Sequence, residues 1–361
     1  QTNSYIKVKS SLQALKDMAL LYRNNLDIKV VGITGSVGKT STKETISYVL
    51  NKKYKVLKTE GNFNNEIGLP LTVFRLRDDD EVAVLEMGIS DFGEMDRLSK
   101  IAQPDISVIT NIGLCHLENL KTRDGILKAK TEIFNNMKPD GIAILNGDDD
   151  KLITVDEVNG KKPERFGINY KDGVYAKDIE NLGLSGTKFV ISGLNCVDGC
   201  KDFEVTVPVP GHHMIYNALA AACVGAALEL TSAQIADGIA DLKTISGRNN
   251  IIKTSKYTLI DDCYNANPVS MKASVDVLDM AIGRKVCILG NMYELGENEK
   301  NLHYDVGQYI GTKNIDVLIT IGDLARHIAM GTDDYMETHF GSYDCEIHSF
   351  DDMEEFNMAY S

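Results

Sequence analysis

A chain of 361 residues with 43% hydrophobic and 25% charged residues is long enough for two or three domains, each with its own apolar core. The net charge of −14 argues against nucleic acid or an anionic membrane surface as the main partner, and no apolar run approaches the ~20 residues of a membrane span. Seven scattered cysteines and the lack of a signal-peptide core in residues 1–27 predict a cytoplasmic protein with reduced thiols.

The first predicted element is a helix over Ser11–Ala19, where Leu12, Leu15 and Ala19 recur at helical spacing. We interpret residues 1–27 as a lead-in to the first domain. The chain does not begin with Met, and residues 350–361 stop within a helical pattern. We therefore expect a fragment of a longer protein.

The second predicted element is a buried strand, Ile28–Ile33, which runs into a glycine-rich loop and a helix over Ser41–Leu50. The loop has the spacing G-x-x-G-x-x-G-K-T, whereas the common phosphate-binding spacing would need glycine at position 33. Glycines let backbone N–H groups approach phosphate oxygens, Lys39 adds a full charge, and the hydroxyl of Thr40 can bind Mg²⁺. The pattern predicts a site for a nucleoside triphosphate. The expected phosphate-binding residues are Thr34, Gly35, Ser36, Val37, Gly38, Lys39, Thr40 and Ser41.

Strands and helices continue to alternate up to about residue 150. Strands are predicted at Val82–Glu86, Ile106–Thr110 and Ile142–Asn146, and helices at Phe92–Lys100 and Arg123–Met137. Short apolar strands joined by helical crossovers predict a parallel sheet with both faces covered.

Glycines and turn residues then break residues 160–210 into short runs, which predict a small antiparallel sheet. An alanine-rich helix follows over Asn217–Leu230. Ser246–Asn249 is the best boundary, because a second strand–helix alternation begins after it. We predict an α/β protein with a central ATP-binding domain over 1–247 and a Rossmann-like C-terminal domain over 248–361, the latter truncated. The elements predicted there are Tyr257–Asp261, Ser270–Ile282, Val286–Leu289, Leu302–Ile310 and Val317–Ile321.

Polar residues at strand ends are the first candidates for chemistry. Glu86 ends a predicted strand, where an acid can hold Mg²⁺ or simply be solvated. His116 lies beyond the next strand, at the sheet edge where ligands bind in open α/β folds, and a structural role is equally compatible with that position. The loop Gly61–Pro70 offers amide groups, although an asparagine-rich turn explains it as well. On composition alone, Lys128 and Lys130 are solvated helix residues.

Two further segments carry polar groups. The pair His212-His213 suggests a metal site, although no third ligand is obvious. The amide of Asn217 can both donate and accept hydrogen bonds, so it can bind the polar edge of an adenine base. The segment Asp261–Pro268 lies at the end of a predicted strand of the second domain. Its polar residues do not indicate a particular reaction by themselves.

Taken together, these segments resemble the Mur ligases, the ATP-dependent amide-forming enzymes of peptidoglycan precursor synthesis. The motifs follow the family order from Gly32 to about residue 325. Within the family, Asp261–Met271 and Leu289–Gly296 are most similar to the members that add D-alanyl-D-alanine. The segments that carry the resemblance are the phosphate loop, Asn64–Pro70, Glu86, His116, Ala129–Phe134, His213–Asn217 and Gly247-Arg248.

The resemblance implies roles for single residues. Lys39, His116 and Lys130 would be catalytic. Two Mg²⁺ ions would be held by Thr40, Glu86, His116 and Lys130, the last as a carbamate. Asn217, Arg248 and Asp262 would contact ATP, and Asn64 and Asn65 would lie near the acyl substrate.

The implied reaction joins D-Ala-D-Ala to a UDP-N-acetylmuramoyl-tripeptide through an acyl phosphate. The expected partners are these two substrates, with no nucleic acid and no membrane span, in a protein that we expect to be monomeric. Two alternatives remain open: a ligase of the same family with another amino-acid donor, and an ATP-binding homologue without catalysis.

Overall fold

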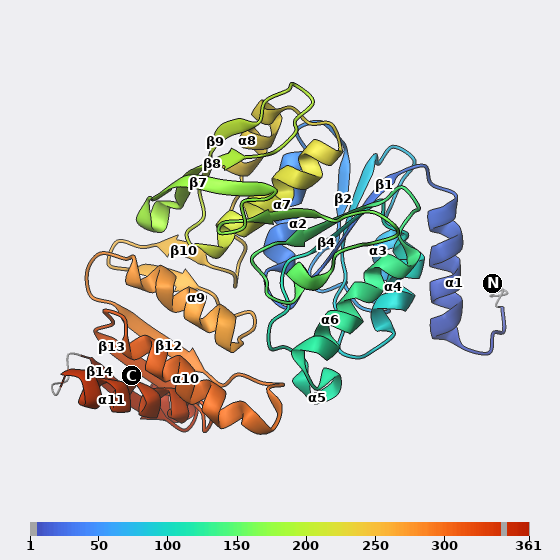
Figure 1. Ribbon diagram of the computed structural model, residues 1–361. Helices are drawn as coiled ribbons and strands as arrows, with labels where there is room; N and C mark the ends of the chain where they lie inside the picture. Colours follow the sequence, from blue (N-terminus) through green and yellow to red (C-terminus); the bar gives the residue numbers. More distant parts are fainter. Residues whose placement is uncertain (1–5, 341–344, 361) are drawn as a thin grey trace.

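The computed structural model describes residues 6–340 and 345–360 (Figure 1). Its largest feature is one nine-stranded sheet in the order β2-β3-β1-β4-β5-β6-β7-β8-β9. In this order, each strand from β2 to β6 is parallel to its neighbour. Strand β8 pairs antiparallel with both β7 and β9. The strands are β1 (Lys29–Thr34), β2 (Val56–Lys58), β3 (Val82–Glu86), β4 (Ile106–Ile109), β5 (Ile142–Asn146), β6 (Glu164–Gly167), β7 (Val174–Asn181), β8 (Thr187–Ser192) and β9 (Asp202–Val207).

Helices cover both faces of this sheet, as the apolar strands predict. An apolar core on one face involves α2, α7 and α8, and a second core on the other face involves α1, α3, α4 and α6 (Figure 1). The helices are α1 (Ser11–Asn24), α2 (Lys39–Leu50), α3 (Gly68–Val73), α4 (Glu94–Ala102), α5 (Leu117–Leu120), α6 (Arg123–Thr131), α7 (His213–Ala227) and α8 (Ser232–Ala240).

The antiparallel strands extend the parallel sheet, whereas the sequence pattern predicted a small sheet of their own. The junction is β6, because Asn146 of β5 pairs with Phe166 of β6 and Phe166 in turn pairs with Val174 of β7. Phe166 is 1% exposed, so it is part of the main core. The short runs of residues 160–210 therefore enlarge the first unit of the fold.

Helix α7 is apolar on nearly every side because it is enclosed by the sheet, α2 and α8. Small residues allow close backbone approach at this contact. A Cβ added to Gly238 of α8 would lie 2.4 Å from Cα of Val49, and one added to Gly225 of α7 would lie 3.0 Å from a methyl carbon of Val49. The C-terminal half of α2 is thus tightly packed between α7 and α8.

The C-terminal part begins with a two-stranded antiparallel ribbon, followed by a parallel three-stranded sheet in the order β12-β13-β14. It has a separate apolar core, and it lies beside the first unit in Figure 1. Its elements are β10 (Asn250–Lys253), β11 (Thr258–Asp261), α9 (Pro268–Asp279), β12 (Val286–Gly290), α10 (Glu299–Gly311), β13 (Val317–Ile321), α11 (Arg326–Phe340), β14 (Glu346–Phe350) and α12 (Met353–Ala359).

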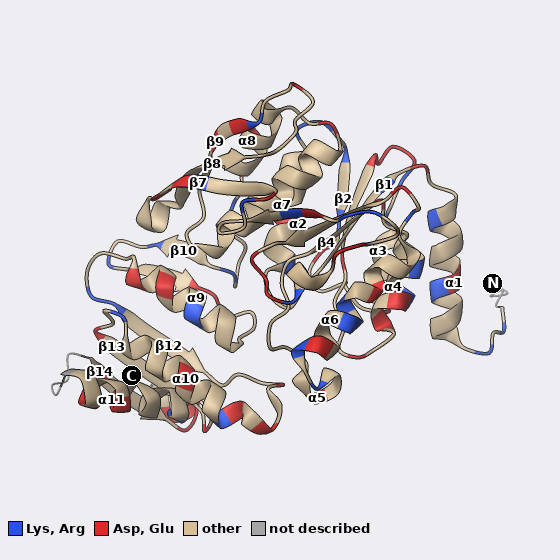
Figure 2. Ribbon diagram, in the orientation of Figure 1, with Lys and Arg blue, Asp and Glu red and all other residues tan. Residues whose placement is uncertain are grey.

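The predicted helix bounds differ from the observed ones at helix starts and at helix ends. Helix α2 begins at Lys39, two residues before the predicted start, and the predicted helix Arg123–Met137 is α6 followed by a short 3₁₀ helix, Glu132–Asn136. Within residues 6–340 and 345–360, no helix is long and apolar enough to cross a membrane. Figure 2 shows basic and acidic residues interspersed along the ribbon, for example on α4 and α6.

Candidate active site

The phosphate loop connects β1 to α2 and is shaped by close backbone packing. Gly38 has φ 81°, a conformation that favours glycine, and it directly precedes α2. A Cβ added to Gly35 would lie 1.9 Å from Oγ1 of Thr110, so only glycine fits against the end of β4. The Nζ atom of Lys39 donates to the carbonyl oxygen of Gly35 at 2.8 Å. The loop therefore has the compact form that a phosphate-binding loop requires.

A cavity of about 580 Å³ lies between the first turn of α2, the N-terminal end of α7 and helix α9 of the C-terminal part. Of the residues predicted to bind the nucleotide, six line it: Val37, Gly38, Ser41, Asn217, Arg248 and Asp262. Thr34, Gly35, Ser36, Lys39 and Thr40 are not part of its lining, although they belong to the same loop and the same helix turn. The cavity is large enough for the base and sugar of a nucleotide.

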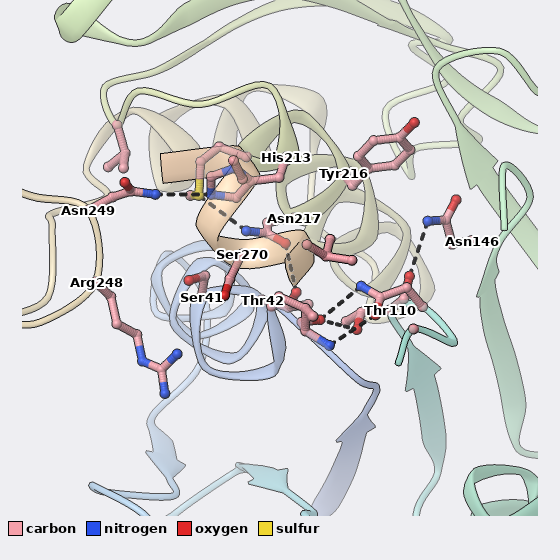
Figure 3. Close-up of a pocket in the computed structure, with 18 of the residues that line it drawn as sticks. Ser41, Thr42, Thr110, Asn146, His213, Tyr216, Asn217, Arg248, Asn249 and Ser270 are labelled. Atoms are coloured by element: carbon pink, nitrogen blue, oxygen red, sulfur yellow. Dashed lines mark hydrogen bonds between the residues drawn. The ribbon is translucent and has the colours of Figure 1, made fainter. Parts of the chain in front are cut away.

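Asn217 connects α7 to α2 at the floor of this cavity. Its Oδ1 accepts from the hydroxyl of Thr42 at 2.9 Å, and its Nδ2 donates to the sulfur of Met214 at 3.2 Å (Figure 3). The same side chain lies 3.6 Å from the position of a Cβ on Gly38. Asn217 is therefore close to the phosphate loop, and its amide is already engaged within the protein.

The segment between the two parts of the fold forms another wall of the cavity. The guanidinium of Arg248 lies over the ring of Tyr264, with its central carbon 4.2 Å from the ring centroid. Nδ2 of Asn249 lies 3.3 Å from Nε2 of His213, so this segment contacts α7 directly (Figure 3). Asp262 accepts from the backbone N–H of Asn249 at 3.1 Å and from the hydroxyl of Ser274. These contacts place Arg248 and Asp262 beside the same cavity.

Glu86 has the features of a ligand for a hard cation. It is the last residue of β3 and pairs with Ile33 of β1, immediately before the phosphate loop. It is 2% exposed, and Asn64 donates to its Oε1 at 2.9 Å. Its Oε2 is buried and accepts no hydrogen bond within the described part of the chain; its nearest cation is Nζ of Lys43 at 3.7 Å. A carboxylate oxygen without a hydrogen bond beside a phosphate loop fits a Mg²⁺ site.

Lys130 is the most unusual residue of the site. It is 1% exposed on α6, and its side chain makes no hydrogen bond or ion pair with any described residue. Burial away from water, together with the nearby charge of Lys39, lowers its pKa from 10.5 to about 7. A large fraction of this amine is therefore neutral at physiological pH, whereas composition predicted a solvated cation.

His116 lies near these two lysines. Burial lowers the pKa of its ring, Lys130 and Lys39 lower it further, and Glu294 opposes the shift. Its Nδ1 lies 3.0 Å from Oε2 of Glu294, which belongs to the C-terminal part. The charges of Lys130 and Lys39 both act on the ring of His116, so these three residues lie in one region of the fold.

The remaining predicted residues have mixed positions. Asn64 contacts Glu86, as described, but Oδ1 of Asn65 accepts from the backbone N–H groups of Ile67 and Gly68 and so caps the start of α3. Among residues 6–340 and 345–360, no group of three or more His, Cys, Asp or Glu side chains is arranged to hold a metal ion. A metal site here would need the hydroxyl of Thr40 or a modified Lys130 as further ligands.

The cavity also contains polar residues that the sequence did not single out. The hydroxyl of Tyr216 donates to Asp148 at 2.9 Å. Nδ2 of Asn146 donates to the carbonyl oxygen of Thr110 at 3.1 Å (Figure 3). The available signal was that Asn146 ends a predicted strand and Asp148 follows it, at the sheet edge where ligands bind.

The lowered pKa of Lys130 predicts a pH dependence of stability. Between about pH 7 and 10.5 the unfolded chain binds more protons at this residue than the folded chain, so the free energy of unfolding should rise with pH. Below about pH 7 the residue is protonated in both states, and the penalty is fully present. The slope is at most ~1.4 kcal/mol per pH unit.

Urea unfolding at a series of pH values, in buffer depleted of carbon dioxide, measures this effect. Lys130→Met should have a flatter curve than the parent protein across the same range and should be the more stable of the two near neutral pH. Parallel curves for the two proteins would show that Lys130 is not deprotonated by burial.

Comparisons with known proteins point in one direction. Residues 33–225 match the model of the Mur ligase middle domain, and residues 247–360 match that of the Mur ligase, glutamate ligase domain. The chain is 40% identical over 334 residues to UDP-N-acetylmuramoyl-tripeptide–D-alanyl-D-alanine ligase of Bacillus subtilis, covering 92% of this chain and 71% of that protein. Its identity to the Escherichia coli enzyme of the same name is 35%, over 89% of this chain and 71% of that protein.

Solved structures agree. A crystal structure of MurF from Acinetobacter baumannii superimposes with a TM-score of 0.85 at 31% identity, covering 98% of this chain and 81% of that one. The MurF ligase of Thermotoga maritima in complex with ADP gives a TM-score of 0.81 at 30% identity, with 98% and 84% covered.

Proposed function

The chain belongs to the Mur ligase family, and we propose that it joins D-alanyl-D-alanine to a UDP-N-acetylmuramoyl-tripeptide in peptidoglycan synthesis, with ATP cleaved to ADP. The B. subtilis and E. coli relatives have this activity in their names. They match about nine-tenths of this chain, and this chain spans 71% of the length of each. The observation that carries the proposal is the buried amine of Lys130 next to His116 and Lys39, beside a phosphate loop. The T. maritima complex with ADP supports ATP as the nucleotide.

The proposed reaction has two steps. A carboxylate oxygen of the tripeptide attacks the γ-phosphorus of ATP, and ADP leaves, so that an acyl phosphate forms. The amine of D-Ala-D-Ala then attacks the acyl carbon; phosphate leaves, the nitrogen loses a proton, and an amide bond is formed. The first step brings two anions together, and the second develops negative charge on the acyl oxygen, which makes positive charge at the site the main requirement for catalysis.

Lys39 and the backbone amides at the start of α2 would bind the ATP phosphates. Lys39 donates to loop carbonyls in this structure, and it would exchange them for phosphate oxygens. Asn217, Arg248 and Asp262 would surround the base and sugar, since all three line the cavity.

We propose two Mg²⁺ positions. Thr40 and Glu86 would hold the first ion, which fits the buried Oε2 atom of Glu86 that accepts no hydrogen bond. His116 and a carbamate on Lys130 would hold the second. When bound, Mg²⁺ would neutralise charge on the phosphates and stabilise charge developing in the transferred group. Asn64 would orient the carboxylate of Glu86 through the hydrogen bond between them.

Carbamylation is chemically reasonable at Lys130. The neutral amine adds to carbon dioxide, a nitrogen–carbon bond forms, and one proton leaves to solvent, so the neutral amine becomes an anionic carbamate. The reaction needs an unprotonated amine, which a pKa of about 7 provides at neutral pH. A buried lysine without a partner would gain Mg²⁺ as a counter-ion in this way.

Asn64 and Asn65 were predicted to lie near the acyl substrate. The contact between Asn64 and Glu86 supports this role for Asn64. For Asn65 the role would fall to its Nδ2 group, because Oδ1 caps α3. We further propose a cytoplasmic location, supported by seven free cysteines, of which Cys196 and Cys200 are near neighbours in sequence without forming a disulfide. A monomeric state stays a prediction.

The donor specificity gives the decisive test. Phosphate release is measured with ATP, Mg²⁺ and UDP-N-acetylmuramoyl-tripeptide, and either D-Ala-D-Ala or one of D-Ala, L-Ala and D-Glu as donor. We expect release to depend on the dipeptide. Turnover with a single amino acid but not with the dipeptide would favour a Mur ligase with another donor, and nucleotide binding without turnover would favour a non-catalytic homologue.

A further inference from the structure

Asn111, just beyond the end of strand β4, contacts the phosphate loop through its side chain. The backbone N–H of Val37 donates to Oδ1 of Asn111 at 2.9 Å, and Nδ2 of Asn111 donates to the carbonyl oxygen of Val37 at 2.9 Å. One amide side chain thus pairs with both polar backbone groups of a single loop residue. Val37 cannot rotate without breaking both hydrogen bonds.

Neighbouring groups reinforce this contact. The backbone N–H of Ser36 donates to the carbonyl oxygen of Asn111 at 3.0 Å, and the N–H of Gly113 donates to the hydroxyl of Ser36 at 2.8 Å. The hydroxyl of Thr110 donates to the carbonyl oxygen of Val37 at 2.7 Å. The segment Thr110–Gly113 therefore fixes Ser36 and Val37 from one side.

Asn111 also lies in the right place to affect a nucleotide, because Asn111, Val37 and Gly38 all line the cavity. The segment around Asn111 is itself anchored: the N–H of Ile112 donates to Oδ2 of Asp149 at 2.8 Å. The loop is thus braced against β4 and the residues after β5.

These hydrogen bonds divide the loop amides into two groups. The N–H groups of Ser36 and Val37 are already bonded to Asn111. Within α2 the first helical hydrogen bond runs from Thr42 to the carbonyl oxygen of Gly38, so the N–H groups before Thr42 have no intrahelical acceptor. Donors at the start of a helix, in the favourable field of its dipole, are well suited to phosphate oxygens.

We propose that Asn111 is a positioning residue for ATP binding: it holds the phosphate loop in its nucleotide-binding form, and the phosphates are bound by the amides of residues 38–41 and not by those of Ser36 and Val37. The proposal rests on nucleotide binding as part of the proposed function. It assigns Asn111 no contact with the reacting atoms.

Amide hydrogen exchange with residue resolution tests the division of the loop. It is measured on the parent protein without ligand and with saturating ADP. Amides 38–41 should exchange at least about tenfold more slowly with ADP, while Ser36 and Val37 should be protected before ADP is added and change less than about twofold. Slowing at Val37 equal to that at Lys39 overturns the proposal. If ADP protects no amide of the chain, the nucleotide itself does not bind, and it is the proposed function that fails.

Substitution tests the positioning role. Asn111→Leu removes both side-chain hydrogen bonds and should weaken ADP binding about tenfold, or ~1.4 kcal/mol, in calorimetric titration. Asn136→Leu is the matched control, because the side chain of Asn136 donates to Asp96 and Ser99, away from the phosphate loop. It should lose thermal stability but keep the parent affinity for ADP.

A second variant keeps the test informative if Asn111→Leu does not fold. Asn111→Asp retains an acceptor for the N–H of Val37 but directs a carboxylate oxygen at the carbonyl of Val37. It should also bind ADP at least about tenfold more weakly, with faster exchange at Val37. Parent-like ADP affinity in either variant of Asn111 contradicts the proposal, since a residue that only stabilises the fold would lower the melting temperature alone.

Discussion

Replacing Lys130 by methionine is expected to lower turnover at least ~10³-fold while the protein stays folded and binds ADP within about twofold of the parent affinity. Methionine fills similar volume without a charge, so the buried site loses no packing. It cannot form a carbamate and therefore offers no ligand to a cation. Loss of one preorganised electrostatic group in an active site typically costs 10²–10³-fold in turnover, and loss of a metal position costs more. Phosphate release with saturating substrates measures the effect.

Lys128→Met is the matched control, since Lys128 lies on the same helix but is exposed, with its Nζ over the ring of Phe92. It should retain nearly full turnover. Lys130→Arg distinguishes charge from carbamylation, because arginine keeps a cation but does not react with carbon dioxide at neutral pH; it should be as inactive as Lys130→Met. In ¹³C-bicarbonate, the parent should give a carbamate carbon resonance that both variants lack. Turnover above a tenth of the parent rate in Lys130→Met would refute the role.

Lys39→Met is expected to have the second large effect, in both binding and turnover. Hydrogen bonds from a charged donor contribute about 1.5–3 kcal/mol each, so losing one to ADP should weaken binding ~10- to 100-fold. The loss in turnover should exceed the loss in affinity, because negative charge on the phosphate oxygens shifts during transfer and needs the cation most at that point. Calorimetry with ADP and initial rates with ATP separate the two effects.

Lys52→Met provides the comparison for Lys39. Lys52 follows α2 and pairs only with the exposed Asp241. This exposed pair contributes little to stability, so ADP binding and turnover should both match the parent. If Lys39→Met binds ADP with parent affinity, the loop does not bind nucleotide phosphates in the manner proposed.

Local patterns predicted the strands and the loop that carry the candidate nucleotide site. The phosphate loop between a buried strand and a helix, and polar residues at the ends of Val82–Glu86 and Ile106–Thr110, follow from strand periodicity and from the position of ligands in open α/β sheets. The structure confirms the strands that carry these residues, with β3 and β4 on either side of β1.

Other features could not be predicted because they depend on contacts between distant segments. The pairing of β6 with both β5 and β7, which makes one sheet of nine strands, has no signal within any window of sequence. The contact between Asn249 and His213 joins residues 36 positions apart, from the segment between the two units and from α7. Lys130 is a third case: its burial depends on neighbouring elements, and only the family resemblance singled it out. Asn65 shows the converse, since the turn that its asparagine-rich loop also allowed engages its Oδ1 at the start of α3.

The close packing of α7 and α8 against α2 limits how far α2 can move. Gly225 and Gly238 contact Val49 near the C-terminal end of α2. The helix whose first amides we propose to bind phosphate is therefore held rigidly at its other end. We therefore expect the C-terminal part to move when a nucleotide binds, while α2 stays fixed. The C-terminal part is joined to the first unit through Gly247, which has a φ of 74°. A larger residue in place of either glycine would therefore displace α2 from the end opposite the phosphate loop, without touching any residue that lines the cavity.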